Sequence, residues 1–566
     1  MSTAPVAEPT AAAGPMPGQP IPIPPDFPVV WETPADAQGF WTSDRMHFPD
    51  PITPLFDDLI RILYQGFSQA AVGYDMPVRA DARRFATYHF AKMAPLPLSM
   101  EEMERLGHSS EQKFGVAMAQ LENLWNNEWL PAIKQHLAFY EELDLESATQ
   151  EQIIRHFAAG LEHQKALWHL HFQIVFSSYL AVSIFEDMYR DIFSGEDGFD
   201  PHRLLQGYDN MTVKSGRALW TLSRRALTIP VVRRILEEEA TTKVMPALQA
   251  SPEGRAFLAD FQSYLTEYGQ RGDNWDVAGP SWIEQPTAAI KNLKDYVGQP
   301  DRDWDAERAA MVAEREAHVA QARERLQGYP QEVVGQFEFF LKAAQTGVVL
   351  TEDHNFWIDF RGIYQMRRLV LALGERLVAA GIIASRDDVF YLTSAEILEM
   401  PARRRGHQSH VAQRKAEMAH FAGIKVPPAL GILPAAPPPD NPMTRFIMKF
   451  FGAPVAPSSN ADEVTGHAGS PGVVRGVARV VRSLADAGRL QKGEILVAET
   501  TAPPWTPIFA TAAAVVTDTG GILSHSAVVA REYGIPAVVG TGIGTSVIPD
   551  GQMIEVDGNA GRVRLL

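Results

Sequence analysis

The sequence predicts a multidomain protein in which a large, mainly α-helical domain is followed by a small β/α domain. At 566 residues the chain exceeds what one hydrophobic core normally serves. Apolar residues follow helical spacing up to about residue 400, and short strand-like apolar runs replace this pattern after about residue 464. Between the two regions lies a stretch rich in proline. These observations together predict two unlike domains and a connector.

The helical domain is predicted to span residues 27–400. Apolar residues recur at three- and four-residue spacing over 153–188, 305–326 and 356–377, and Pro and Gly separate such stretches. The preceding residues 1–26 are rich in Ala and Pro, without the basic start and apolar run of a signal peptide. We expect them to form a disordered extension.

Residues 401–463 are predicted to form a proline-rich linker, with a short helix near 443–451. Residues 464–566 are predicted to form the β/α domain, because short apolar runs alternate there with glycines. The expected strands are 473–482, 494–498, 513–517, 537–539, 553–556 and 562–566.

The composition narrows the possible functions. A net charge of −17 argues against a surface that binds nucleic acid or an anionic membrane, and no apolar run is expected to span a membrane. The chain has no cysteine, which excludes disulfides, thiolate metal sites and a cysteine nucleophile. These properties fit a cytoplasmic protein.

The most informative segment is TDTGGILSHSAVVAREYGIPAVVG at residues 517–540. It is typical of a strand, a glycine turn, a helix and a second strand, with His525 where the helix begins. Free N–H groups at a helix N-terminus stabilise an anion, and a neutral imidazole is a nucleophile toward phosphorus. This pattern suits a histidine that accepts a phosphoryl group and passes it on.

Three hydroxyl side chains accompany this histidine. Thr517 and Thr519 are candidates to hydrogen-bond the phosphoryl oxygens, and Ser524 is a candidate to cap the helix and orient the ring. A purely structural role in the turn and cap is the alternative for all three.

The segment resembles the phosphohistidine (swivelling) domain of the PEP-utilising enzymes, which include PEP synthase, pyruvate phosphate dikinase and rifampicin phosphotransferase. The family pattern T-D-x-G-G-x-x-S-H-x-A-x-V-A-R-E-x-G-x-P-x-V-V-G is kept at every specified position. Residues 469–481, GSPGVVRGVARVV, are similar to the start of the same domain. The resemblance implies that His525 is the catalytic phosphoryl carrier of a small swivelling domain.

Shorter segments of the helical region resemble the substrate domain of rifampicin phosphotransferase and related aryl kinases. They are residues 41–55, 204–212, 268–272, 282–286, 351–359 and 387–393. Two positions depart from the pattern: Gln270 stands where relatives often carry His, and Trp275 stands near an acidic position. The departures imply that the substrate of this chain differs from rifampicin.

No glycine-rich loop with P-loop spacing and no room for an ATP-grasp domain is found in the sequence. The chain resembles the substrate-plus-histidine subunit of split aryl kinases such as phenylphosphate synthase and hydroxyphenyl-ketone kinase. This implies a separate ATP-grasp subunit. ATP and its Mg²⁺ or Mn²⁺ would be bound mainly by that subunit, and ATP would be converted to AMP and phosphate. The expected acceptor is a small phenol, whose hydroxyl pKa is near that of tyrosine.

Two alternatives stay open. The acceptor could be a rifampicin-like antibiotic or another alcohol, or the chain could be a phosphorelay carrier whose helical region docks a protein. Whichever acceptor is used, a hydroxyl benefits from a neighbouring base or cation. The candidates for this role, each with a structural alternative, are Arg271, Asp353, His354, Asp359 and Arg361.

We predict no metal site in this chain. His163, His169 and His171 lie close together in sequence, but they do not follow the i, i+4 spacing that places two ligands on one helix face. Aromatic residues nearby either wall an apolar pocket or belong to the core: Trp168, Phe172, Phe176, Tyr179 and Phe185.

Overall fold

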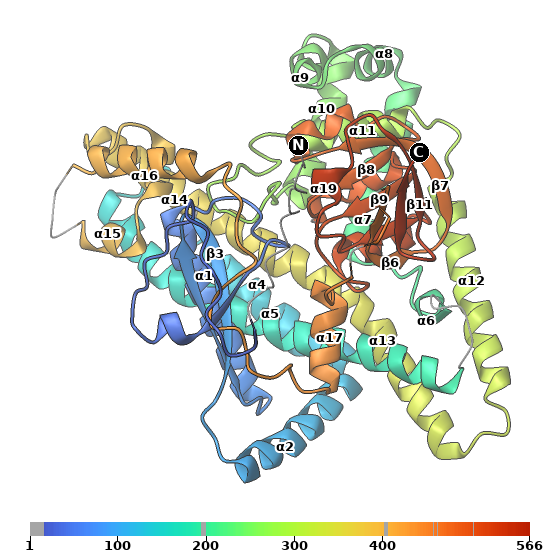
Figure 1. Ribbon diagram of the computed structural model, residues 1–566. Helices are drawn as coiled ribbons and strands as arrows, with labels where there is room; N and C mark the ends of the chain where they lie inside the picture. Colours follow the sequence, from blue (N-terminus) through green and yellow to red (C-terminus); the bar gives the residue numbers. More distant parts are fainter. Residues whose placement is uncertain (1–15, 194–199, 401–405, 457, 461, 502) are drawn as a thin grey trace, which may run out of the picture.

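The computed structural model describes residues 16–193, 200–400, 406–456, 458–460, 462–501 and 503–566. It confirms the predicted fold class: a large helical body is followed by a β/α domain that packs beside it (Figure 1). The expected helices and strands occur close to their predicted positions, and the differences fall at the two ends of the helical region.

The long helix α5 (Gln150–Ile192) is the centre of the helical body. It begins at Thr149, whose hydroxyl accepts the Gln152 N–H while the Gln152 side chain accepts the Thr149 N–H. Packed against it are α1 (Pro54–Gly73), α4 (Leu130–Phe139), α13 (Gln331–His354) and α14 (Arg361–Ala379). A π-helical turn, η3 (Asn355–Phe360), joins α13 to α14.

By length and composition alone, α5 is a candidate membrane span, contrary to the expectation that no run is long enough. In its most apolar window, 61% of the residues are buried inside the protein. Such burial is typical of a core helix, because the apolar side chains already have protein partners.

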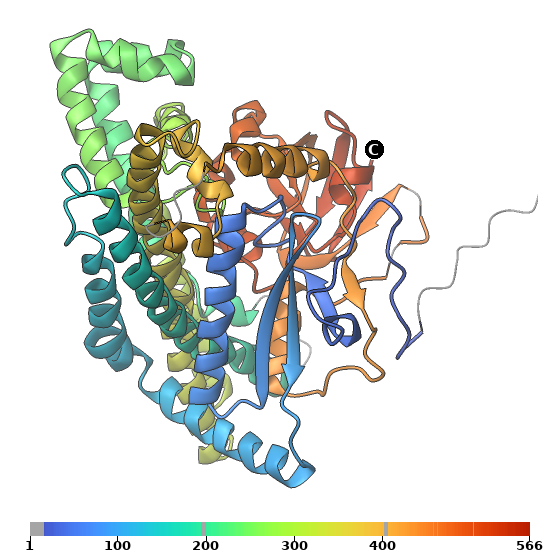
Figure 2. The same ribbon diagram turned by 90° about the vertical axis from the view of Figure 1, so that its left-hand side faces the viewer.

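The remaining helices complete the body and an arm. The arm, which stands out from the body in Figure 2, consists of α8 (Pro230–Glu238), α9 (Thr241–Gln249) and α10 (Pro252–Tyr268), and it is joined to α7 (Met211–Thr228) and α11 (Thr287–Val297). Elsewhere lie α2 (Met100–Ala119), α3 (Leu121–Leu124), the π turn η2 (Trp125–Trp129), α6 (Asp200–Arg203), α12 (Trp304–Arg325), the 3-10 turn η4 (Arg386–Tyr391) and α15 (Ser394–Glu399).

A four-stranded sheet covers one side of the helical body, which the sequence pattern did not predict. Its order is β2 (Val78–Phe85), β3 (Tyr88–Pro95), β1 (Phe40–Ser43) and β4 (Ala429–Gly431), with every pair antiparallel. The short turn η1 (Asp36–Gln38) precedes β1. Because β4 comes from residues 401–463, that stretch is more than a linker.

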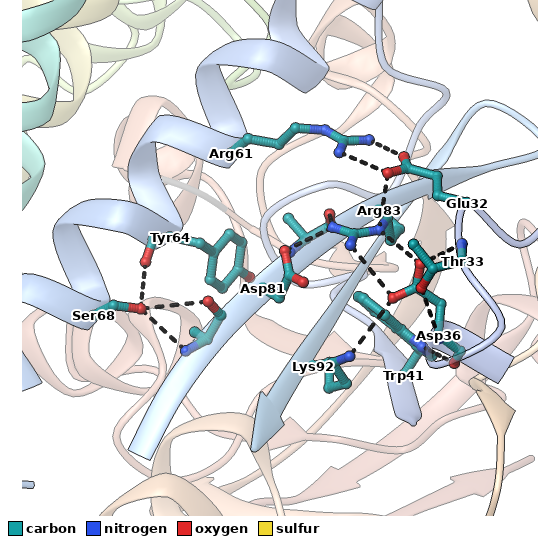
Figure 3. A network of polar contacts seen from close by, with 12 residues as sticks. Glu32, Thr33, Asp36, Trp41, Arg61, Tyr64, Ser68, Asp81, Arg83 and Lys92 are labelled. Atoms are coloured by element: carbon teal, nitrogen blue, oxygen red, sulfur yellow. Dashed lines mark hydrogen bonds and ion pairs between the residues drawn. The ribbon is translucent and has the colours of Figure 1, made fainter. Parts of the chain in front are cut away.

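An ion-pair network holds the start of the chain on this sheet (Figure 3). The Arg83 guanidinium pairs with Glu32, Asp36 and Asp81 at 2.7–3.3 Å, and the Lys92 ammonium lies 4.3 Å from the centre of the Trp41 ring. The network ties residues on either side of β1 to β2 and β3.

The linker and the N-terminal extension both need correction. The linker region contains α16 (Gln408–Phe421) and α17 (Pro442–Phe451) besides β4, and only the second helix was expected. Of the predicted disordered extension, residues 1–15 lie outside the described residues. Residues 16–26 are ordered against β4, since the Ile21 N–H donates to Gly431 O and the Leu433 N–H to Gln19 O.

The C-terminal domain is built on an eight-stranded sheet with the order β5-β12-β11-β7-β8-β9-β10-β6. The strands are β5 (Glu463–Thr465), β6 (His467–Ser470), β7 (Val473–Val480), β8 (Ile495–Ala498), β9 (Ala514–Thr517), β10 (Ala537–Val539), β11 (Met553–Asp557) and β12 (Arg562–Leu565). The central run β7-β8-β9-β10 is parallel, and β8, β9 and β10 are buried on both faces. The helices α18 (His525–Glu532) and α19 (Gly544–Val547) and the turns η5 (Leu484–Arg489) and η6 (Pro503–Ala510) complete the domain.

Polar contacts hold the C-terminal domain on the helical body. Arg308 of α12 pairs with Glu532 of α18 at 2.7 Å, and Arg45 pairs with Glu499 after β8. Beside them, α17 lies between the two parts (Figure 1): its Lys449 ammonium is 2.7 Å from Asp187, while its Lys449 carbonyl accepts the Leu523 N–H. The connection is therefore a structured helix that contacts both domains.

Glycine at position 66 sets the distance between α1 and α5. A Cβ atom on Gly66 would lie 2.7 Å from the backbone carbon of Trp168, whereas one on Gly115 of α2 would meet nothing within 4 Å. For Gly66→Ala we expect a net loss of unfolding free energy, because overpacking costs about 1–3 kcal/mol and the clash is with backbone. Thermal and urea unfolding would measure it.

The matched control is Gly115→Ala, for which we expect a gain of up to about 1 kcal/mol from helix propensity. If Gly66→Ala and Gly115→Ala were equally stable, α1 and α5 would be able to move apart without loss of unfolding free energy.

Candidate active site

His525 is the first residue of α18, as its motif predicts, and it lies at the boundary between the two domains. Its side chain is only 12% exposed, because the helical body covers it. The ring Nε2 lies 3.4 Å from Thr506 Oγ1, and Nδ1 lies 3.6 Å from Glu352 Oε1. The predicted carrier histidine is therefore found docked on the predicted substrate domain.

Glu352 is the acid that faces His525, and it was not among the predicted site residues. It lies in the last turn of α13 and is buried, and its Oε2 accepts the Thr212 hydroxyl at 2.7 Å. Burial raises the pKa of this carboxyl, but hydrogen bonds and charges from His525, Thr212 and His354 outweigh burial and lower it. Glu352 is consequently ionised beside the histidine at neutral pH.

The three hydroxyl residues near the histidine differ in their contacts. Thr517 donates to Thr519 O at 2.9 Å and Thr519 donates to Glu499 O at 3.2 Å, so both serve the turn in this arrangement. Ser524 occupies the N-cap position, as expected, but it makes no side-chain capping bond. Its buried hydroxyl has no hydrogen-bond partner in the described part of the chain, which leaves it available to a phosphoryl oxygen.

A pocket opens at the domain boundary beside His525. Glu352 and Thr506, which both contact His525, form part of its wall, as does Thr212, which donates to Glu352. The pocket therefore adjoins the histidine through Glu352 and Thr506. Trp304 of α12 and Tyr533 after α18 line it as well. The remaining lining residues are Asn210, Val213, Arg302, Glu307, Arg308, Met311, Val528, Val529 and Glu532. The pocket thus combines aromatic and aliphatic walls with an ionised carboxylate near the imidazole.

Asp353 lies away from His525 and holds the start of α7. Its Oδ1 accepts the buried Met211 N–H at 2.7 Å, a favourable place for a carboxylate at a helix N-terminus. Burial raises its pKa to about 6. The structure therefore gives this candidate base a structural contact.

The two arginine candidates also have structural partners. Arg271 is buried, donates to Ser215 Oγ at 2.8 Å and stacks 4.3 Å above the Trp282 ring. Burial lowers its pKa, although Glu352 acts in the opposite direction. Arg361 lies over Phe356 and Trp357, and donates to Glu267 O at 2.9 Å. The guanidinium of Arg361 points away from the histidine cluster described next.

His354 and Asp359 come together in a second, buried cluster that includes His171 of α5. Asp359 Oδ1 accepts from His171 Nδ1 at 2.7 Å, and its Oδ2 lies 3.9 Å from His354 Nε2. Burial lowers the pKa of His171 to about 3 and that of His354 to about 4, and raises that of Asp359 to about 7. The sequence separation of 188 residues between His171 and Asp359 hid this grouping.

Aromatic rings enclose this second cluster. Trp168 and Phe172 lie edge-on to His171 at 4.9 and 4.7 Å, and Trp275 stacks near Trp168 at 6.2 Å. Trp275, one of the two departures from the family pattern, also contacts His47 at 5.4 Å. The other departure, Gln270, donates to Thr266 O at 3.3 Å on its own helix turn.

Two families match parts of the chain. Residues 170–352 match the rifampicin phosphotransferase fourth domain, and residues 490–561 match the mobile domain of PEP-utilising enzymes. The first match ends at Glu352 and the second contains His525. The two halves of the site therefore lie within the two matched domains.

Curated relatives agree with these matches. The chain is 40% identical over 558 residues to chondramide synthase cmdD of Chondromyces crocatus, covering 96% of this chain and 14% of that protein. It is 26% identical to the uncharacterised phosphotransferase YvkC of Bacillus subtilis (94% of this chain, 63% of the relative) and 32% identical to a rifampicin phosphotransferase of Streptomyces (64% and 41%). The chain thus covers less than two thirds of the length of each of these relatives, and about one seventh of the length of the synthase. The chain therefore contains one segment that matches the rifampicin phosphotransferase fourth domain and one that matches the mobile domain of PEP-utilising enzymes, and it is similar to proteins named as phosphotransferases.

Proposed function

We propose that this chain carries a phosphoryl group on His525 from an ATP-grasp subunit to the hydroxyl of a small phenol. The observation that supports this most directly is the position of His525 against Glu352 and the boundary pocket. A carrier histidine divides one transfer between distant sites into two in-line transfers. The docked arrangement corresponds to the second of these transfers.

The nucleotide is proposed to bind on the separate ATP-grasp subunit, with Mg²⁺ or Mn²⁺ as its counter-ion. In the first transfer, one phosphoryl group of ATP passes to His525 Nε2 and the other passes to water, so ATP gives AMP and phosphate overall. Polar contacts such as Arg308–Glu532 and Arg45–Glu499 suit a domain that must leave the helical body, because the charges of each pair regain water when the two parts separate.

In the second transfer the acceptor occupies the boundary pocket. The phenol ring lies between Trp304 and Tyr533, and its oxygen faces His525. The oxygen–phosphorus bond forms as the nitrogen–phosphorus bond breaks, and the electron pair of that bond returns to Nε2. The hydroxyl proton passes to solvent, while the ionised carboxylate of Glu352, which faces Nδ1, favours the proton on that nitrogen and orients the ring so that Nε2 carries the phosphoryl group. Ser524 donates to a phosphoryl oxygen.

Replacing the carrier tests the proposal. For His525→Ala we expect aryl phosphate formation to fall by at least about 10³-fold, as on loss of a covalent nucleophile. The assay combines this chain, the ATP-grasp subunit, ATP, Mg²⁺ and a panel of phenols, and measures AMP and aryl phosphate. His420→Ala, a change of an exposed histidine, is the control.

The same assay decides between the acceptors. Phosphorylation of rifampicin or an aliphatic alcohol in preference to every phenol would replace the phenol by that class, and phosphate transfer to a small carrier protein would favour the relay function. Release of AMP by this chain without the ATP-grasp subunit would contradict the split arrangement.

Replacing the acid tests its part in the second transfer. For Glu352→Gln we expect transfer from phosphohistidine to the phenol to slow by about 10²–10⁴-fold, because the carboxylate that orients the imidazole from its Nδ1 side is lost. Phosphorylation of His525 by the ATP-grasp subunit should continue at its normal rate. Rapid quench with ³²P-labelled ATP separates the two steps.

The neighbouring change Asp353→Asn is the matched control, because it removes a buried charge one residue away while its amide oxygen still accepts from Met211. If both variants slowed both steps equally, Glu352 would have a structural role only.

A further inference from the structure

The buried cluster of His171, His354 and Asp359 has no part in the transfer proposed for His525. One ring nitrogen from each histidine and one carboxylate oxygen lie within 4.8 Å of one another, and all three residues are buried. They come from three elements, α5, the end of α13 and η3. The cluster therefore depends on the tertiary fold and is not a feature of one helix.

The hydrogen bonds of the cluster leave acceptor atoms facing each other. His354 Nδ1 lies 2.7 Å from Leu350 O, and because a carbonyl only accepts, Nδ1 carries the proton and Nε2 a lone pair. That lone pair faces Asp359 Oδ2 at 3.9 Å. Oδ2 is buried and has no hydrogen-bond partner among the described residues. Two buried acceptors that face each other are unfavourable unless a proton or a metal cation lies between them.

The π turn brings the two residues onto one face. His354 and Asp359 are five positions apart, a spacing that points in different directions on an α-helix. In η3 the backbone bonds run from i to i+5, so residues five apart lie one above the other. Such turns are frequent at functional sites, and here the turn aligns two ligand atoms toward His171.

The distances suit a metal ion. Zinc–nitrogen and zinc–oxygen bonds are about 2.0–2.2 Å, so two ligands of a tetrahedral ion lie about 3.5 Å apart. His354 Nε2 and Asp359 Oδ2 are 3.9 Å apart, so small side-chain shifts would bring both onto one ion. His354 Nδ1 donates to the Leu350 carbonyl, and an outer hydrogen bond of this kind normally fixes the orientation of a ligating imidazole. No lysine or arginine pairs with Asp359 in the part of the chain that the structure describes, so its charge is available to a cation.

We propose that His171, His354 and Asp359 bind a divalent transition-metal ion of the Zn²⁺ or Mn²⁺ class. Two imidazoles and one carboxylate suit zinc, iron and manganese, and three protein ligands leave a coordination position open to water or a small ligand. His47, whose Nδ1 is held by Asp44 at 2.8 Å, contacts Trp275 of the surrounding rings. Mg²⁺ would bind poorly, because it prefers oxygen ligands.

The test measures metal in the tag-free full chain by mass spectrometry after purification, and again after chelation and titration with Zn²⁺, Mn²⁺ or Co²⁺. We expect about one ion per chain, visible absorption bands with Co²⁺, and a lower melting temperature after chelation. Asp359→Asn and His354→Gln should each weaken binding by at least about 10-fold, the least effect seen when even an outer hydrogen bond is removed.

The matched control is His169→Gln, two residues from His171 on the same helix, which should keep the metal. His525→Ala should also keep it, so failure of the metal site and failure of the phosphoryl carrier are separable. Absence of binding at stoichiometric Zn²⁺, Mn²⁺ and Co²⁺ in the wild type would overturn the proposal. Equal binding by wild type, His354→Gln and Asp359→Asn would overturn it too, and the wild-type titration decides even if a variant does not fold.

Discussion

The last turn of α13 is the constraint on which both clusters depend. Successive residues of an α-helix point about 100° apart, so three neighbours must face three different surroundings. Here Glu352 faces the C-terminal domain, Asp353 faces the start of α7, and His354 faces α5 and η3. All three are buried because a different part of the protein packs on each side. Burying consecutive ionisable groups is costly, and such costs are concentrated at functional sites.

Close helix packing makes this arrangement possible. A Cβ atom on Gly347 of α13 would lie 2.7 Å from Ser178 O of α5, so only glycine lets the two helices approach so closely there. The contact lies less than two turns before Glu352. It fixes the height and rotation of the α13 end relative to His171 on α5, and thereby the position of every side chain that follows.

Much of the fold was predictable, because it rests on local patterns. The helical period gave α5 and α12 nearly to the residue, and glycine-separated apolar runs gave the strands from β7 to β12. The sheet formed by β1 to β4 was missed because β4 pairs with β1 across nearly 400 residues of chain. The short strands β5 and β6 were missed because their sequences, EVT and HAGS, lack the apolar run that marks the equally short β10 (AVV).

The site was predictable where one segment carries it and unpredictable where the fold assembles it. His525 and its turn lie in one continuous motif, so their position at a helix start followed from the sequence. The segment 351–359 was recognised, but which of its acids faces the histidine depends on helix rotation and on what packs against each side. Helical spacing argued against a metal site formed by His163, His169 and His171, which all lie on α5. It did not consider His354 and Asp359, which a π turn brings together. The partners of His171 come from another helix, which no local spacing reveals.

The α7 helix connects Asp353 to the boundary pocket. Asp353 Oδ1 and the Asn210 side chain both accept N–H groups of its first turn, from Met211 and Val213. Between those anchors lies Thr212, which donates to Glu352 at 2.7 Å. Asp353, which faces away from His525, thus fixes the position of the Thr212 hydroxyl. That hydroxyl in turn orients Glu352, which faces His525. A structural contact and a chemical one are coupled through a single turn of helix, so Asp353 can matter to the site without touching a substrate.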